Sequence, residues 1–209
     1  MNPSLRGLYA IADTQFLDDA QLVPAVEAAI AGGTRVVQYR DKQHPPEIRQ
    51  RHAKKISDLC RRHGVLFLVN DDAALAMETG ADGVHLGRED MGLRAARALI
   101  GDNKLIGVSC YNELERALAA EQDGADYIAF GSFFPSRTKP GAVRATPELL
   151  RAARTQLRIP VVAIGGITPE NGATLIEAGA DMLAAIDGVF NQTDIRAAAQ
   201  RYTKLFPKI

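Results

Sequence analysis

Short apolar runs alternate with longer amphipathic stretches along the whole 209-residue chain. The runs are rich in β-branched residues, which is typical of buried strands, whereas apolar residues at helical spacing in the longer stretches predict helices. Strands are expected at residues 8–12, 35–40, 66–70, 83–87, 105–109, 127–131, 160–164 and 182–186. Helices are expected at residues 46–63, 73–79, 93–100, 113–122, 146–156, 169–178 and 191–206.

The junctions before the strands repeat. Gly-Ala-Asp stands directly before a predicted strand at residues 80–82, 124–126 and 179–181, and residues 32–34 look like a variant. A helix that ends in glycine and turns into a buried strand is typical of a repeating β–α unit. Eight units without a break in composition predict one α/β domain over residues 1–209, a single (β/α)8 TIM barrel. A doubly wound open sheet is the alternative, although no Gly-x-Gly-x-x-Gly follows the first strand.

Composition narrows the class of partner. Lys plus Arg and Asp plus Glu both number 25, so the formal net charge is zero, and the chain has no Trp. Neither nucleic acid nor a membrane is therefore the expected partner, and any cation cluster must be local, which suits a small anionic ligand. Cys60 and Cys110 match no metal spacing or disulfide framework, which predicts a reducing, cytoplasmic location. No apolar run is long enough to span a bilayer, and no signal-peptide core is expected near Met1.

The segment that ends the second predicted strand carries alternating polar residues. Gln38, Arg40 and Lys42 share one face of the strand, and Tyr39 and Asp41 share the other. An amide, a guanidinium and an ammonium on one face form a good receptor for a multiply charged oxyanion. A solvated strand end with ordinary surface charges is the alternative.

Two carboxylates follow adjacent strands. Asp71 follows the third strand directly after Asn70, and Asp90 follows the fourth. Because the carboxyl ends of barrel strands meet at one face, these carboxylates could share a hard cation, and Mg²⁺ is expected there. Asp71 or Asp90 could instead cap the helix that follows it. For Asp72, the residue after Asp71, a helix cap is the favoured interpretation.

Later loops add two candidate phosphate sites. Gly165 and Gly166 precede a predicted helix and could present backbone N–H groups to a phosphate, although they could equally form an ordinary βα turn. The loop at 135–141 could close over an anionic group with Ser136, Arg137, Thr138 and Lys139. No Ser-His-Asp or Cys-His arrangement is evident, and His85 is expected to be a polar residue of the barrel interior. An anion receptor with a metal and no nucleophile suits a reaction in which pyrophosphate departs.

Taken together, these motifs make the chain similar to the thiamin phosphate synthase family, also called thiamine-phosphate pyrophosphorylase. The resemblance runs from Leu8 to Asp187. The motifs that carry it lie at residues 38–42, 70–71, 83–90, 107–109, 136–139 and 163–167.

The resemblance implies a transferase that joins a hydroxymethylpyrimidine pyrophosphate to a thiazole phosphate, or its carboxylated form, and releases pyrophosphate. It further implies that the C–O bond breaks first and that the thiazole nitrogen captures the resulting carbocation, so that no general base is needed. The implied catalytic residues are Arg40, Lys42, Ser109 and Lys139, and the implied Mg²⁺ ligands are Asp71 and Asp90. The implied substrate-binding residues are Gln38, Tyr39, Arg40, Asp41, Lys42, Asn70, Ser109, Ser136, Arg137, Thr138, Lys139, Gly165, Gly166, Ile186 and Asp187.

One position departs from the family pattern. Where the family commonly has Val-Ser-Ala-Ile after the eighth strand, this chain has Ile-Asp-Gly-Val at 186–189. A carboxylate at Asp187 would repel a phosphate if it pointed inward, and we expect it to face away as a helix N-cap or loop residue. The alternative functions are a thiazole tautomerase and a non-catalytic barrel that senses thiamin precursors. Assembly into a homo-oligomer is left open.

Overall fold

The computed structural model describes residues 5–135, 141 and 143–207. The strands are β1 (Gly7–Asp13), β2 (Val36–Arg40), β3 (Leu66–Asn70), β4 (Gly83–Leu86), β5 (Leu105–Tyr111), β6 (Tyr127–Phe130), β7 (Val161–Ile164) and β8 (Met182–Ala185). The helices are α1 (Leu22–Ala31), α2 (Pro46–His63), α3 (Ala73–Thr79), α4 (Leu93–Ile100), α5 (Leu114–Gln122), α6 (Pro147–Gln156), α7 (Gly172–Glu177), α8 (Asp187–Phe190) and α9 (Ile195–Thr203).

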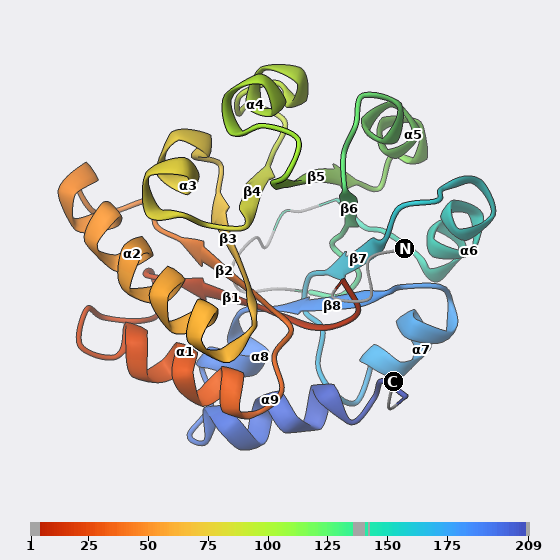
Figure 1. The fold of residues 1–209 in the computed structure, drawn as a ribbon. Helices are drawn as coiled ribbons and strands as arrows, with labels where there is room; N and C mark the ends of the chain where they lie inside the picture. Colours follow the sequence, from red (N-terminus) through yellow and green to blue (C-terminus); the bar gives the residue numbers. More distant parts are fainter. Residues whose placement is uncertain (1–4, 136–140, 142, 208–209) are drawn as a thin grey trace.

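The strands form a closed parallel barrel in chain order. Each strand pairs with the next, and β8 closes the barrel by pairing with β1, with Leu8 opposite Leu183 and Tyr9 opposite Ala184. Figure 1 shows this closure, with the helices arranged around the outside of the strands. The predicted (β/α)8 TIM barrel is therefore confirmed, and the alternative of an open sheet is excluded because this sheet has no edge strand.

The repeated Gly-Ala-Asp junctions have one structural role. Each glycine adopts a positive φ, between 69° at Gly80 and 117° at Gly179, which turns the chain from a helix into the next strand. Each aspartate then accepts a backbone N–H from the start of the preceding strand, as Asp126 Oδ2 does from Ile106 at 2.7 Å. Asp82 accepts the Phe67 N–H at 2.8 Å in the same way. The repeat thus ties the amino-terminal ends of neighbouring strands together.

Two apolar cores stabilise the barrel. The larger lies between the outward faces of the strands and the helices, and it includes Leu8, Tyr39 and Phe67. The smaller fills the barrel with inward residues such as Tyr9, Leu68 and Met182. Because alternate residues of a strand face opposite sides, every strand can contribute to both cores. The filled interior leaves the carboxyl-terminal mouth of the barrel for polar chemistry.

The helices differ from expectation near both ends of the chain. The sequence analysis did not predict α1. The helix expected at 191–206 is the shorter α9, which begins after its N-cap, Asp194, whose side chain accepts the Ala197 N–H at 2.9 Å. The expected helix at 169–178 is α7, which begins at Gly172, and a further short helix, α8, follows β8 directly.

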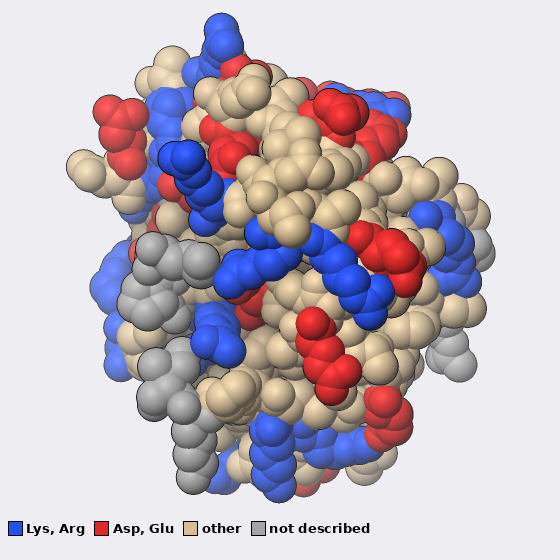
Figure 2. Space-filling view, turned by 90° about the vertical axis from the view of Figure 1, so that its right-hand side faces the viewer, with Lys and Arg blue, Asp and Glu red and all other residues tan. Residues whose placement is uncertain are grey.

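Among the described residues, no helix combines the length and apolar character needed to cross a membrane. Figure 2 shows that basic and acidic side chains are interspersed over one face of the molecule, so that neither positive nor negative charge covers that face continuously.

Candidate active site

A cavity of about 1070 Å³ opens at the carboxyl-terminal ends of the strands. All eight strands or their following residues contribute to its lining. The floor and wall residues taken from the strands are Tyr9, Ile11, Gln38, Arg40, Asn70, His85, Ser109, Tyr111, Ala129, Val162, Ile164, Ala184 and Ala185. This is the end of the barrel at which enzymes of this architecture carry their active sites.

The inward face of β2 brings its predicted residues into this cavity. Gln38, Arg40 and Lys42 all line it. The guanidinium of Arg40 is held by the buried carboxylate of Asp13 on β1, with Nη1 at 2.6 Å from Oδ2. The ammonium of Lys42 is paired with Asp71 across the mouth of the barrel. These pairs orient two cations toward a common space while leaving further N–H donors for an anionic ligand.

Tyr39 and Asp41, which the family resemblance assigns to substrate binding, are not among the residues that line the cavity. Strand alternation turns both side chains outward, where Tyr39 is packed in the core between barrel and helices. The Tyr39 hydroxyl donates to Asp41 Oδ2 at 2.6 Å, and the Asp41 carboxylate also accepts the N–H groups of Gln43 and His44 at 3.0 and 3.1 Å. Burial opposes ionisation of Asp41, but these donors outweigh it and lower its pKa. The two residues therefore shape the loop after β2.

Asp71 and Asp90 lie together at the mouth of the cavity, as predicted for two strand-end carboxylates. Burial raises the pKa of Asp71, and its hydrogen bond with Asp90 adds to that effect. Burial acts against ionisation of Asp90 too, but hydrogen bonds from Asp71 and from the Gly87 N–H, at 2.6 Å, lower its pKa. Two carboxylates this close form an oxygen-only donor pair that a hard cation could bridge.

The helix-cap alternative fails for both of these aspartates. Asp72 is the residue that caps α3, accepting the Leu75 N–H at 2.9 Å, as the sequence interpretation favoured. The N-cap of α4 is Gly92. Asp71 instead holds a positive φ of 64°, which is uncommon for a residue other than glycine and is often found at functional sites.

A chain of hydrogen bonds crosses the cavity floor. Gln38 Nε2 donates to the Tyr9 hydroxyl at 2.7 Å, and Tyr9 and Tyr127 join their hydroxyls at 2.9 Å. His85 then bridges the Tyr127 hydroxyl and the Ser109 hydroxyl, with both contacts at 2.9 Å. Burial raises the pKa of both tyrosines, so they stay neutral and act as fixed polar groups. His85 is a polar residue of the barrel interior, as expected, and it positions the predicted Ser109.

The far wall of the cavity is built by the loops after β7 and β8. Gly165 and Gly166 line it, and a Cβ on Gly166 would lie 2.3 Å from the Pro135 carbonyl oxygen. The Asn171 side chain fixes this loop, since Nδ2 donates to the Gly166 carbonyl at 3.1 Å and Oδ1 accepts the Thr168 N–H at 2.8 Å. The glycines are thus required by close backbone packing beside the cavity.

Asp187 does not have the expected role of a helix cap facing away from the site. It lies in the first turn of α8, where Ile186 is the N-cap and no side-chain cap bond forms. Both residues line the cavity, and Asp187 Oδ1 is buried without a hydrogen-bond partner among the described residues. Asp187 therefore lies beside the part of the cavity that the loop glycines line, with one carboxylate oxygen buried.

Several predicted residues lie outside the described part of the chain, and several cavity residues were not predicted. Ser136, Arg137, Thr138 and Lys139 belong to the first group. Tyr9 and Tyr111 belong to the second, together with Arg88, whose guanidinium lies 4.7 Å from the centre of the Tyr111 ring. Asp13 and Tyr127, which were not predicted either, lie behind the lining as partners of Arg40 and Tyr9. Strand alternation could have placed Tyr9 inside the barrel, but its partners come from distant strands.

Neither cysteine is suited to be a nucleophile. Cys60 and Cys110 are fully buried and unpaired. Burial raises the pKa of each thiol to about 12, so neither forms a thiolate near neutral pH. Both lie outside the cavity lining.

Fold and cavity together define a (β/α)8-barrel enzyme whose mouth gathers cations, paired carboxylates and fixed hydroxyls for an anionic small molecule. Comparison with known proteins narrows this class. The family model for thiamine monophosphate synthase matches residues 8–189. The thiamine-phosphate synthase of Nitrosococcus oceani is 51% identical over 99% of this chain and 95% of its own length. That of Thioalkalivibrio sulfidiphilus is 50% identical over 97% and 96%.

A solved structure agrees with these relatives. Thiamine phosphate pyrophosphorylase from Pyrococcus furiosus superimposes with a TM-score of 0.89 at 36% identity, covering 97% of this chain and 96% of that one. The chain belongs to the thiamine monophosphate synthase family. The family predicted from the sequence motifs is therefore confirmed, and with it the transferase class and a role in thiamine biosynthesis.

Proposed function

We propose that this chain condenses 4-amino-5-hydroxymethyl-2-methylpyrimidine pyrophosphate with 4-methyl-5-(2-phosphoethyl)thiazole to give thiamin phosphate and pyrophosphate, or with the carboxylated form of that thiazole to give the same two products and carbon dioxide. The observation that carries this proposal is the convergence of Arg40, Lys42, Asp71 and Asp90 on one cavity. Two cations and two carboxylates suit a pyrophosphate bound together with a metal ion.

The pyrimidine pyrophosphate would lie against β2 and its neighbours. Arg40 and Lys42 face the pyrophosphate, and Gln38 and Asn70 lie on the same side of the cavity to orient the pyrimidine. Ser109 offers a hydroxyl from the opposite wall, positioned by His85 at 2.9 Å. Because Arg40 is already held by Asp13, it binds the anion without first losing side-chain freedom.

Asp71 and Asp90 are the residues that would hold Mg²⁺. Their fit rests on the closeness of the two side chains and on a donor set made of carboxylate oxygens alone. When bound, Mg²⁺ neutralises charge on the pyrophosphate oxygens. Lys42 contacts Asp71 and so joins the carboxylate pair to the anion receptor.

The bond between the pyrimidine methylene and the pyrophosphate oxygen breaks with its electron pair going to pyrophosphate. The thiazole nitrogen then donates its lone pair to the methylene carbon, forming the C–N bond. No proton has to be removed from that nitrogen, so the cavity needs no general base. Arg40 and Lys42 stabilise the charge that develops on the leaving group.

The thiazole phosphate would occupy the β7–β8 side of the cavity. Gly165 and Gly166 allow close approach of a phosphate to the backbone there, beside Ile186 and Asp187. Ser136, Arg137, Thr138 and Lys139 follow Pro135 in the chain and complete the proposed assignment as the residues that contact thiazole phosphate and pyrophosphate. Their roles rest on the family motif alone.

Product formation with each substrate omitted in turn separates this function from its alternatives. We expect thiamin phosphate and pyrophosphate in equal amounts, and only when both substrates are present. A tautomerase would convert a carboxylated thiazole phosphate without the pyrimidine substrate, and a sensor would bind both ligands without turnover. Either of those results would overturn the proposal.

A further inference from the structure

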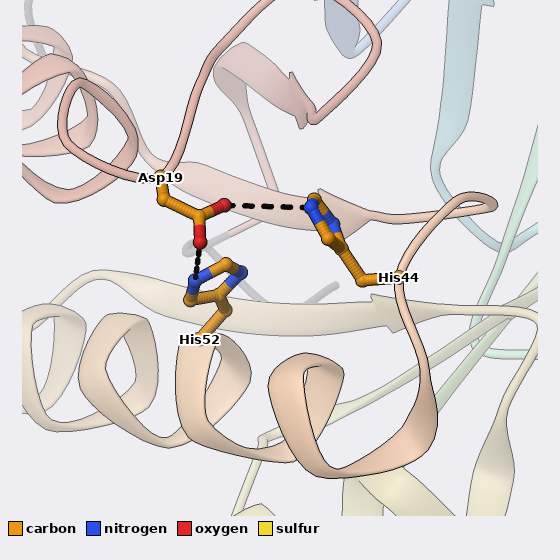
Figure 3. Close-up of side chains that lie close together, drawn as sticks. All are labelled: Asp19, His44 and His52. Carbon is orange, nitrogen blue, oxygen red and sulfur yellow. Dashed lines mark ion pairs between the residues drawn. The ribbon is translucent and has the colours of Figure 1, made fainter.

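A second group of candidate ligands lies outside the cavity, between the loops that follow β1 and β2. Asp19 precedes α1, His44 precedes α2, and His52 lies on α2 (Figure 3). Asp19 Oδ1 is 3.5 Å from His44 Nε2, and Asp19 Oδ2 is 3.6 Å from His52 Nε2. One ligand atom from each side chain lies within 4.8 Å of the others. None of the three lines the cavity described above.

Both imidazole rings are oriented through their other nitrogen. His44 Nδ1 is 2.9 Å from Asp41 Oδ2, and His52 Nδ1 is 3.4 Å from the Tyr39 hydroxyl. The Tyr39 hydroxyl itself donates to the Asp41 carboxylate, which joins the two supports into one unit. Both Nε2 atoms are thereby directed to Asp19, as Figure 3 shows. A hydrogen bond at Nδ1 that leaves Nε2 for a cation is the usual arrangement of metal-binding histidines.

Charge and burial also favour a cation at this position. His52 is 3% exposed, and burial lowers its pKa, which keeps the ring in the neutral form that a metal requires. The carboxylates of Asp19 and Asp41 supply the negative charge around the two rings. Asp19 is about half exposed, so the group can be reached from solvent.

From this geometry we propose that Asp19, His44 and His52 bind a divalent transition-metal ion of the Zn²⁺ type. Ligand atoms around tetrahedral zinc at about 2.0–2.1 Å lie about 3.3–3.4 Å apart. The Asp19 carboxylate approaches His44 at 3.5 Å through Oδ1 and His52 at 3.6 Å through Oδ2, and one atom from each side chain lies within 4.8 Å of the others, so the three side chains would draw together around one ion. Two imidazoles and one carboxylate select such a metal over Mg²⁺, which prefers oxygen donors. The fourth position would be taken by water.

The bound ion would connect the loops that follow β1 and β2. One loop follows β1, and the other carries Lys42 two residues before His44. Asp41 already turns this second loop by accepting the His44 N–H at 3.1 Å. The metal would thus restrain the segment beside the cavity while remaining separate from the Asp71 and Asp90 pair. This inference does not depend on the proposed reaction.

Metal binding to the chelator-treated full chain tests the proposal. Titration with Zn²⁺ against a chromogenic chelator should give one tight site per chain, and Co²⁺ should give the visible bands of four-coordinate nitrogen and oxygen ligation. We expect Asp19→Asn and His44→Ala each to weaken Zn²⁺ binding at least ~10-fold, because each removes a direct ligand. Zn²⁺ should raise the melting temperature of the wild-type chain and lose this effect in both variants.

Matched variants identify the site. Asp18→Asn changes an exposed aspartate next to Asp19, and His63→Ala changes an exposed histidine at the other end of α2; both variants should bind Zn²⁺ as the wild type does. Asp71→Asn should also leave this binding unchanged. The proposal is overturned if no tight site exists, if Asp71→Asn removes it, or if Asp19→Asn and His44→Ala retain wild-type affinity and Co²⁺ spectrum.

Discussion

At the scale of single residues, the cavity is organised by pairs of side chains from different strands. Arg40 is held by Asp13, Gln38 by Tyr9, and Ser109 by His85. Such pairing fixes functional groups before a ligand arrives, which lowers the entropic cost of binding. Asp187 is the contrasting case, because one of its carboxylate oxygens is buried with no partner among the described residues.

Asp187→Asn should tighten binding of the thiazole phosphate. The carboxylate lies on the side of the cavity assigned to that phosphate, and removing its charge removes a repulsion. We expect KM for the thiazole substrate to fall about threefold to tenfold, with KM for the pyrimidine substrate unchanged. Steady-state kinetics on both substrates measures this, with exposed Asp102→Asn as the control. A rise in the thiazole KM would show that the carboxylate assists binding.

Single residues also show what the sequence could predict about the site. Strand alternation placed Gln38, Arg40 and Lys42 on one face correctly, because that rule depends only on neighbours in the chain. It could not reveal that Asp13 is the partner of Arg40, since the pairing joins residues 27 positions apart. Strand alternation likewise does not show that Tyr39 and Asp41 shape the loop after β2. The family resemblance assigns the whole segment to the substrate site.

At the scale of elements, the Gly-Ala-Asp junction is the repeated unit that joins the starts of neighbouring strands. In the sequence, the motif marks the turn before each of three predicted strands. The structure adds that its aspartate accepts a backbone hydrogen bond from the start of the preceding strand. Helices were predicted less well than strands. α1 has no acidic residue in its first turn and no side-chain cap at its start, so only Gly32 marks one of its ends, and α8 is a single turn.

Asp126→Ala should destabilise the fold without changing the cavity. The Ile106 N–H would lose its acceptor at 2.7 Å, and Arg97 would lose an ion pair at 2.6 Å. An unsatisfied, largely buried N–H costs about 1–3 kcal/mol of unfolding free energy. Urea denaturation followed by circular dichroism measures the loss.

The matched control is Asp123→Ala, which breaks an exposed pair with Arg94 and should cost less than about 1 kcal/mol. Equal stability of the two variants would contradict a structural role for the junction aspartates.

At the scale of the whole molecule, closure of the barrel places groups from all eight strands around one cavity. The sequence indicated this architecture through its repeats, but it could not give the shape of the cavity. Shape depends on which inward residues fill the barrel, such as Tyr9 and Met182, and on which leave space above them. The region of 136–139, which the motifs assign to substrate binding, lies outside the described residues.

The two buried thiols report on global unfolding. Their pKa of about 12 lies above the value near 8.5 of an unfolded cysteine, so the folded chain holds these protons more tightly. The stability that this contributes is therefore present at neutral pH and declines as the pH rises above about 8.5. We expect Cys60 and Cys110 to react with a thiol reagent at pH 8 at least ~100-fold more slowly in the native chain than in urea. Rapid labelling of either native thiol would contradict their burial.

The central claim is that paired strand-end carboxylates and the β2 cations release pyrophosphate with the help of a divalent metal. Its most direct test is pyrophosphate release from both substrates with Mg²⁺ and with EDTA, in the wild type and in Asp90→Asn. Asparagine can still accept the Gly87 N–H, so the loop is retained while the charge is removed.

We predict release by the wild type that EDTA abolishes, and a loss of about 100-fold or more in kcat/KM for Asp90→Asn at equal stability. Release that is insensitive to EDTA, or an Asp90→Asn variant with wild-type kcat/KM, would contradict the account.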